Sequence, residues 1–78
     1  MKESTQSGLD RYAKYRIPTG GFLRRVLEND LIAAILKADE DNLRDIHEII
    51  MYILNNLPIG SYGSVKNVNE WIQGRHKV

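Results

Sequence analysis

The chain has 78 residues, no cysteine and a formal net charge of +1. A chain of this length forms one domain and buries only roughly 60–65% of its unfolded surface, so self-association would add stability. The absence of cysteine excludes disulfides and thiolate chemistry. No apolar run approaches the roughly 18 residues of a membrane span, and we therefore expect a cytoplasmic protein with no membrane partner.

The small net charge hides an uneven distribution along the chain. Residues 9–25 carry five basic side chains against one acidic, and residues 28–48 carry seven acidic against two basic. A basic region beside an acidic one suits an anionic ligand or complementary contacts between subunits. A solvated charge pattern explains it equally well.

The N-terminal segment, residues 1–8, has polar and charged side chains without an apolar period, so we expect a disordered tail there. Residues 9–78 then form a single helical domain. Its first helix covers about residues 9–16 and ends before Pro18, because proline disfavours helical backbone in the residue that precedes it.

A second helix over about residues 20–29 and a third that begins at Leu31 follow. Asn29 and Asp30 lie between them, and both residue types favour helix caps over helix interiors. Asp30 is the expected N-cap of the third helix. The pattern is also compatible with one bent helix.

The longest predicted helix covers about residues 40–56, with Asp39 as a cap and an acidic first turn at the positive end of the helix dipole. Its apolar stripe, which predicts the centre of the core, comprises Leu43, Ile46, Ile50, Ile53 and Leu57. Ser64 caps a last helix that turns Trp71 inward. The chain therefore predicts an all-α bundle of about five short helices.

The start of the second helix combines features of an anion site. Two glycines leave backbone N–H groups unshielded behind a possible threonine cap, and helix N-termini attract phosphate. Arginines lie before and one turn after this point. The predicted ligand-binding residues are Arg16, Thr19, Gly20, Gly21, Arg24, Arg25 and Tyr62. The spacing matches neither a P-loop nor a dinucleotide fingerprint, and a glycine turn that lets Phe22 pack closely is the alternative.

The aromatic and titratable residues refine this hypothesis. Tyr62 lies in a loop between two glycines and is the preferred ring for stacking on a base. His47 is flanked by acidic neighbours that do not face it in a helix, and it belongs to no recognisable triad. The acidic cluster near Asp39 lacks calcium-loop spacing. We expect no enzymatic activity, no catalytic residue, no metal and no cofactor.

The run Ile-Pro-Thr-Gly-Gly-Phe-Leu over residues 17–23, the segments 38–42 and 60–64, and Trp71 resemble a family of short, largely uncharacterised phage and prophage proteins. The resemblance covers about residues 15–71. That family usually has tryptophan where Tyr62 stands and proline where Val65 stands. The resemblance implies a phage-encoded accessory protein that acts in the host bacterial cytosol.

Three functions follow as hypotheses. The first is a homo-oligomeric binding protein that sequesters a phosphate-bearing small molecule, such as a nucleotide immune signal, as a counter-defence. The second is an inhibitor or virion-assembly adaptor that binds a host protein through its apolar helices. The third is a small DNA-binding protein, but a net charge of +1 does not favour nucleic acid as a partner.

Overall fold

The computed structural model describes residues 1–74, which form six helices and contain no strand. The helices are α1 (Glu3–Tyr15), α2 (Gly21–Leu27), α3 (Leu31–Lys37), α4 (Glu40–Arg44), α5 (Ile46–Asn56) and α6 (Val65–Ile72). The prediction of an all-α fold is confirmed. The last four residues of the predicted domain, 75–78, lie outside the described residues.

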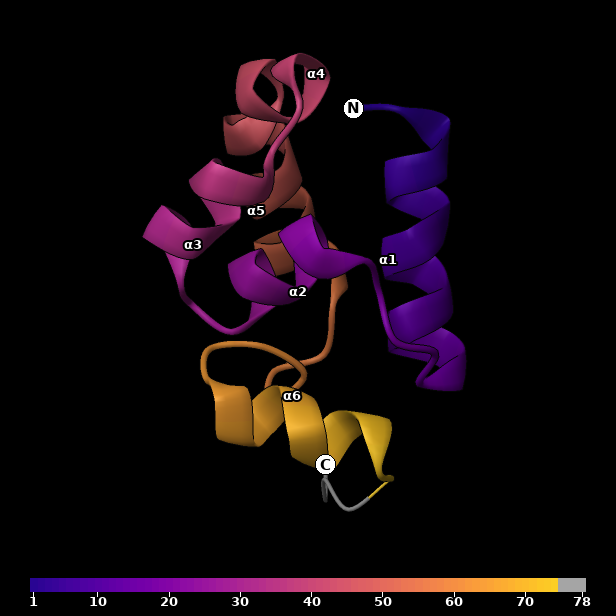
Figure 1. Cartoon of the computed structure of the whole chain (residues 1–78). Coiled ribbons are helices and arrows are strands. Elements are labelled where there is room, and N and C mark those ends of the chain that lie inside the picture. The colour runs from indigo at the N-terminus through magenta and orange to yellow at the C-terminus, as the bar shows by residue number, and fades with distance from the viewer. Residues whose placement is uncertain (75–78) are drawn as a thin grey trace.

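The helices surround one core (Figure 1). α1 runs along one side of the molecule, α3 lies at the opposite edge, and α6 crosses one end. The core takes side chains from every helix except α4, and its buried members are Leu9, Tyr12, Phe22, Leu27, Ala34, Ile49, Ile53, Leu57, Val68 and Trp71. Within the described residues, none of the helices combines the length and apolar composition that crossing a membrane requires.

The N-terminal segment differs from the prediction, because α1 begins at Glu3 and replaces the disordered tail expected over residues 1–8. Thr5 is buried, and the terminal ammonium donates a hydrogen bond to Glu48. The Lys2 ammonium donates to the Asp39 carboxylate at 3.1 Å. These partners lie about 40 positions away in sequence, so no local pattern could indicate that they hold the first turn.

The middle of the chain contains more and shorter helices than predicted. Asn29 adopts a left-handed backbone with φ of 64°, so α2 and α3 are two helices rather than one bent helix. The predicted helix over 40–56 is broken at Asp45, whose φ of −96° and ψ of 7° leave the helical region. The longest helix is therefore α1, with 13 residues.

The predicted caps within this region are confirmed. The Asp30 carboxylate accepts from the Ala33 N–H at 3.2 Å, and the Asp39 carboxylate accepts from the Asn42 N–H at 2.8 Å. The Ser64 hydroxyl accepts from the Asn67 N–H at 3.0 Å at the start of α6. Each cap satisfies an N–H group that has no partner inside its helix.

Buried hydrogen bonds join α1 to two segments that are distant in sequence, α6 and the loop before it. The Trp71 indole N–H donates to the Tyr12 carbonyl oxygen at 2.8 Å, and the Tyr12 hydroxyl donates to the Ser61 carbonyl oxygen at 2.5 Å. Burial raises the pKa of Tyr12 to about 12. The predicted inward position of Trp71 is confirmed.

α3 differs from an ordinary amphipathic helix, because a small side chain faces the core and large aliphatic side chains face outward. Ala34 is fully buried, whereas Ile32 and Leu36 are 79% and 82% exposed. Small alanine side chains let a helix lie close to its neighbour, which here is α2. The large aliphatic side chains of α3 are left on the outside.

Candidate functional site

The structure does not gather the predicted ligand residues into one place. Arg16 ends α1 with φ of 61°, and its Nη1 atom donates to the Trp71 carbonyl oxygen at 2.8 Å. Its guanidinium carbon lies 4.0 Å from the centre of the Trp71 ring. This cation–π contact and hydrogen bond join the end of α1 to α6.

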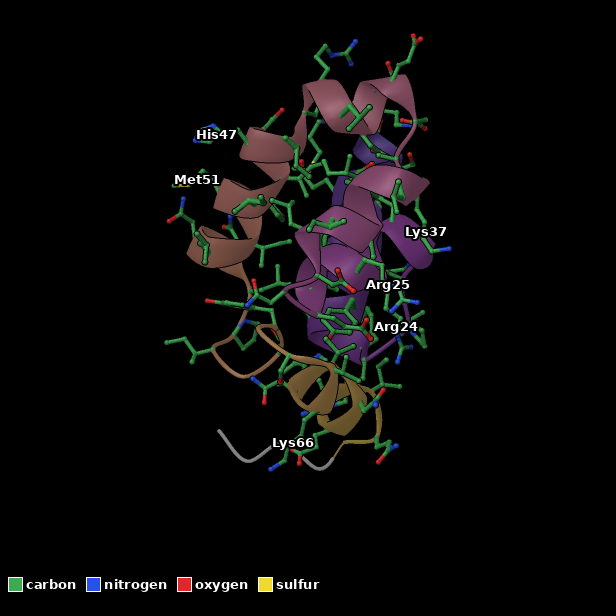
Figure 2. All side chains as sticks on the ribbon, turned by 60° about the vertical axis from the view of Figure 1, so that its left-hand side comes forward. Arg24, Arg25, Lys37, His47, Met51 and Lys66 are labelled. Atoms are coloured by element: carbon green, nitrogen blue, oxygen red, sulfur yellow. The ribbon has the colours of Figure 1, made fainter. Side chains whose placement is uncertain are left out.

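Arg24 and Arg25 converge on a buried carboxylate instead of an open site. Arg24 Nε and Arg25 Nη1 lie 3.0 Å and 3.3 Å from the oxygens of Glu28, whose side chain is only 3% exposed. Arg24 also donates to the Asn69 side-chain oxygen at 2.6 Å, which ties α2 to α6. Figure 2 shows both arginines on the same side of the molecule as Lys37. These bonds hold both guanidinium groups on partners within the fold, although the two side chains are still 37% and 43% exposed.

The glycine turn forms an open groove of about 230 Å³ against α1 and α4, lined by Ser4, Thr5 and Asn42 together with Phe22 and Leu23. Gly20, rather than Thr19, is the N-cap of α2, and no side chain caps this helix. The Thr19 hydroxyl donates to the Gly20 carbonyl oxygen at 3.2 Å, so the expected threonine cap is corrected. Gly20 and Gly21 are exposed, and Arg24 and Arg25 do not line this groove.

Tyr62 belongs to a different and more apolar pocket, with a cavity of about 170 Å³. It lies where α2, α3 and α5 meet the loop over residues 57–63. Its apolar walls are Val26, Leu31, Ile50, Ile53, Leu54 and Tyr62. This is the largest grouping of apolar side chains around a described cavity, and we take it as the candidate site.

The loop that carries Tyr62 is held firmly against the core. The Gly63 N–H donates to the Leu27 carbonyl oxygen at 2.7 Å, and the Ser61 hydroxyl donates to the Pro58 carbonyl oxygen at 2.7 Å. Gly63 has φ of 110°, a conformation that side-chain-bearing residues rarely adopt. The pocket is therefore preformed on this side.

The rim of the pocket combines exposed apolar side chains with one neighbouring carboxylate, that of Asp30. Leu31 and Leu54 border the cavity and are 50% and 53% exposed. The exposed Asp30 lies between the lining residues Asn29 and Leu31. Most of the other carboxylates of segment 28–56 pair with Lys2, Arg44, the terminal ammonium or the arginines of α2. In Figure 2, His47 and Met51 of α5 lie on the opposite side from Arg24 and Arg25.

Most of the pocket residues were not predicted as functional. Ile50 and Ile53 were interpreted as the core stripe of one long helix, but Ile50 is only half-buried and lines the cavity. The available signal was an excess of apolar side chains over residues 31–36 and 46–54 relative to what a short core can hold. It indicated surplus apolar surface without locating it, because location depends on how the helices pack.

The fold and the pocket together define a small all-α domain with an apolar pocket within its described residues. Comparison with protein-family models, with curated proteins and with solved structures gives no match for this chain.

Proposed function

We propose that this chain is a non-enzymatic module that binds a protein partner by taking an apolar side chain into the pocket between α2, α3 and α5. The observation that carries the proposal is the cavity of about 170 Å³ with apolar walls and two exposed leucines, Leu31 and Leu54, at its rim. An apolar concavity with an apolar rim is the form that anchor side chains of protein partners use.

The size and charge of this surface indicate what kind of partner fits. Cavities of about 150 Å³ hold a benzene-sized group, so one leucine or phenylalanine side chain matches the pocket. Beside the pocket, the exposed Asp30 stands between the lining residues Asn29 and Leu31 and gives the rim a negative charge. A partner helix that carries one large apolar anchor flanked by lysine or arginine would complement both features.

The hypothesis of a phosphate-bearing ligand remains a prediction with weaker geometric support. Arg24 and Arg25 pair with buried Glu28, Arg16 is held on Trp71, and α2 has only seven residues. The resemblance to phage proteins also remains a prediction, and with the pocket it favours a host protein as the partner. Counter-defence would then act through a protein contact.

Photo-crosslinking in bacterial cells tests the proposal. Benzoylphenylalanine is placed at Leu54 on the pocket rim, or at Ile59, which is 86% exposed and does not line the pocket. The proposal expects one dominant crosslinked protein from position 54 and its absence from position 59. Leu54→Arg should abolish recovery of that protein in a tagged pull-down, because the arginine obstructs the pocket and repels a basic partner.

Equal crosslinking from both positions, or retention of the partner by Leu54→Arg, would overturn the proposal. Native mass spectrometry of the purified protein separates it from the small-molecule hypothesis. A retained mass of nucleotide size would favour the phosphate ligand instead.

A further inference from the structure

The outer face of α3 has no cover within the described part of the chain. Leu31, Ile32, Ile35 and Leu36 are 50%, 79%, 39% and 82% exposed, while Ala34 is fully buried on the inner side. Figure 1 shows α3 at the edge of the molecule opposite α1. An apolar stripe of this kind on the outside of a small domain favours an interface.

The sequence of this stripe has a symmetry that identifies the occupant. Residues 31–36 read Leu-Ile-Ala-Ala-Ile-Leu, which is the same in both directions. In two α3 helices packed antiparallel about a two-fold axis between Ala33 and Ala34, Leu31 lies level with Leu36 of the second copy. Ile32 likewise lies level with Ile35 of the second copy. An isologous interface requires this kind of self-complementary patch.

The charges beside the stripe also suit a second copy. The Asp30 carboxylate is turned back to accept from the Ala33 N–H at 3.2 Å, and Lys37 is directed toward Gly21 at the start of α2. The stripe itself therefore carries no charge, so pairing with itself buries no like charges. The antiparallel arrangement brings the helix end with Asp30 beside the end with Lys37, and opposite ends of the helix dipoles attract.

We propose that this chain forms a two-fold symmetric homodimer through antiparallel packing of α3 against α3 of the second copy. A specific interface buries at least roughly 1,000 Å² in total, or about 500 Å² per copy, which is a tenth of the 4985 Å² surface of this chain. The four aliphatic residues supply the apolar centre of such an area. The two surfaces share Leu31, which also borders the pocket, but Ile32, Ile35 and Leu36 do not line it.

Sedimentation equilibrium over about 1 µM to 1 mM tests the dimer, in a range where affinities of modest interfaces fall. Wild type should show a concentration-dependent dimer. Ile32→Glu should raise the dimer dissociation constant roughly tenfold or more, because an unpaired carboxylate would enter an apolar interface. Ile59→Glu is the matched control on the loop and should behave like wild type. A monomeric wild type, or equal loss in the control, overturns the proposal.

A charge-pair experiment tests the antiparallel register. Ile32→Glu and Ile35→Lys should each form weaker homodimers than wild type. Their mixture should prefer a heterodimer, in which the introduced carboxylate and ammonium lie level. Native mass spectrometry measures how much of each homodimer and of the heterodimer is present in the mixture. Circular dichroism checks that each variant is folded. Absence of a preferred heterodimer overturns this register. Leu54→Arg should still dimerise, so failure of the pocket proposal and failure of the dimer are separable.

Discussion

The contact between α1 and α6 and the helix α3 use aliphatic and aromatic side chains in opposite ways. Where α1 meets α6, Trp71 is 4% exposed, and its indole N–H and ring contact Tyr12 and Arg16. In α3, only the small Ala34 is fully buried and the large side chains point outward. The α1–α6 contact buries its large side chains and pairs their polar groups, whereas α3 leaves its large apolar side chains exposed.

This difference indicates a division of roles within one small domain. A buried aromatic with satisfied hydrogen bonds contributes to the free energy of unfolding. Exposed leucines and isoleucines contribute little to it, and their burial becomes favourable when another surface covers them. We infer that the α1–α6 contact stabilises the fold and that α3 and the adjoining pocket serve binding.

The largest expected effect is on the α1–α6 side. Trp71→Ala should lower the free energy of unfolding by about 3–5 kcal/mol, because it removes a buried ring and the donor to Tyr12. Leu36→Ala on exposed α3 should change it by no more than about 0.5 kcal/mol below the dimer concentration range. Urea unfolding of dilute protein measures both. Similar losses for the two variants would contradict the division of roles.

The next largest effect is a loss of free energy of unfolding at alkaline pH. The pKa of Tyr12 is raised to about 12 from an ordinary value of 10, so the folded state holds the phenol proton more tightly than the unfolded state. The stability that the protonated Tyr12 phenol contributes is fully present below pH 10 and is lost as pH rises through about 12. Two pKa units correspond to a loss of about 2–3 kcal/mol.

The matched variant for this pH dependence is Tyr12→Phe. It loses the hydrogen bond to Ser61 at every pH, but its stability should fall less between pH 10 and 12 than that of wild type. Urea unfolding at several pH values in this range compares the two slopes. Parallel slopes would mean that the Tyr12 phenol does not titrate differently in the two states.

The arginine pair should give a smaller effect on stability. Replacing Arg24 and Arg25 together by alanine leaves the buried Glu28 carboxylate without both guanidinium donors, and we expect a loss of about 1–3 kcal/mol. Arg44→Ala is the control, because that side chain is 67% exposed. Thermal unfolding monitored by circular dichroism reads both. If the double variant is as stable as the control, the two arginines are not needed for the fold, and their predicted role in ligand binding would be favoured again.

The smallest effect concerns the glycine turn. A Cβ atom added at Gly21 would meet only the flexible Lys37 side chain, with the Cδ atom at 3.4 Å. Gly21→Ala should therefore raise the free energy of unfolding by about 0.5 kcal/mol, since alanine loses less backbone entropy than glycine in a helix. Destabilisation by this variant would show that the turn needs glycine for packing.

Much of the secondary structure could be predicted, but the candidate site could not. The seven predicted ligand residues fall in separate places, and only Tyr62 lines the apolar pocket. Arg24 finds Asn69 across 45 positions of sequence, and this contact explains why it is held in the fold. Such pairings form when the helices pack together. The local pattern of arginines beside two glycines does not reveal which distant residues they will contact.

The sequence by itself determined the features that depend on neighbouring residues. The all-α class, the caps at Asp30, Asp39 and Ser64, and the inward position of Trp71 follow from helical period and from side chains that reach an N–H group three residues away. Only the tertiary structure decided that α1 starts at Glu3, that α3 turns Ala34 inward and that Glu28 is buried. These features depend on contacts between distant segments, which form when apolar burial brings the helices together.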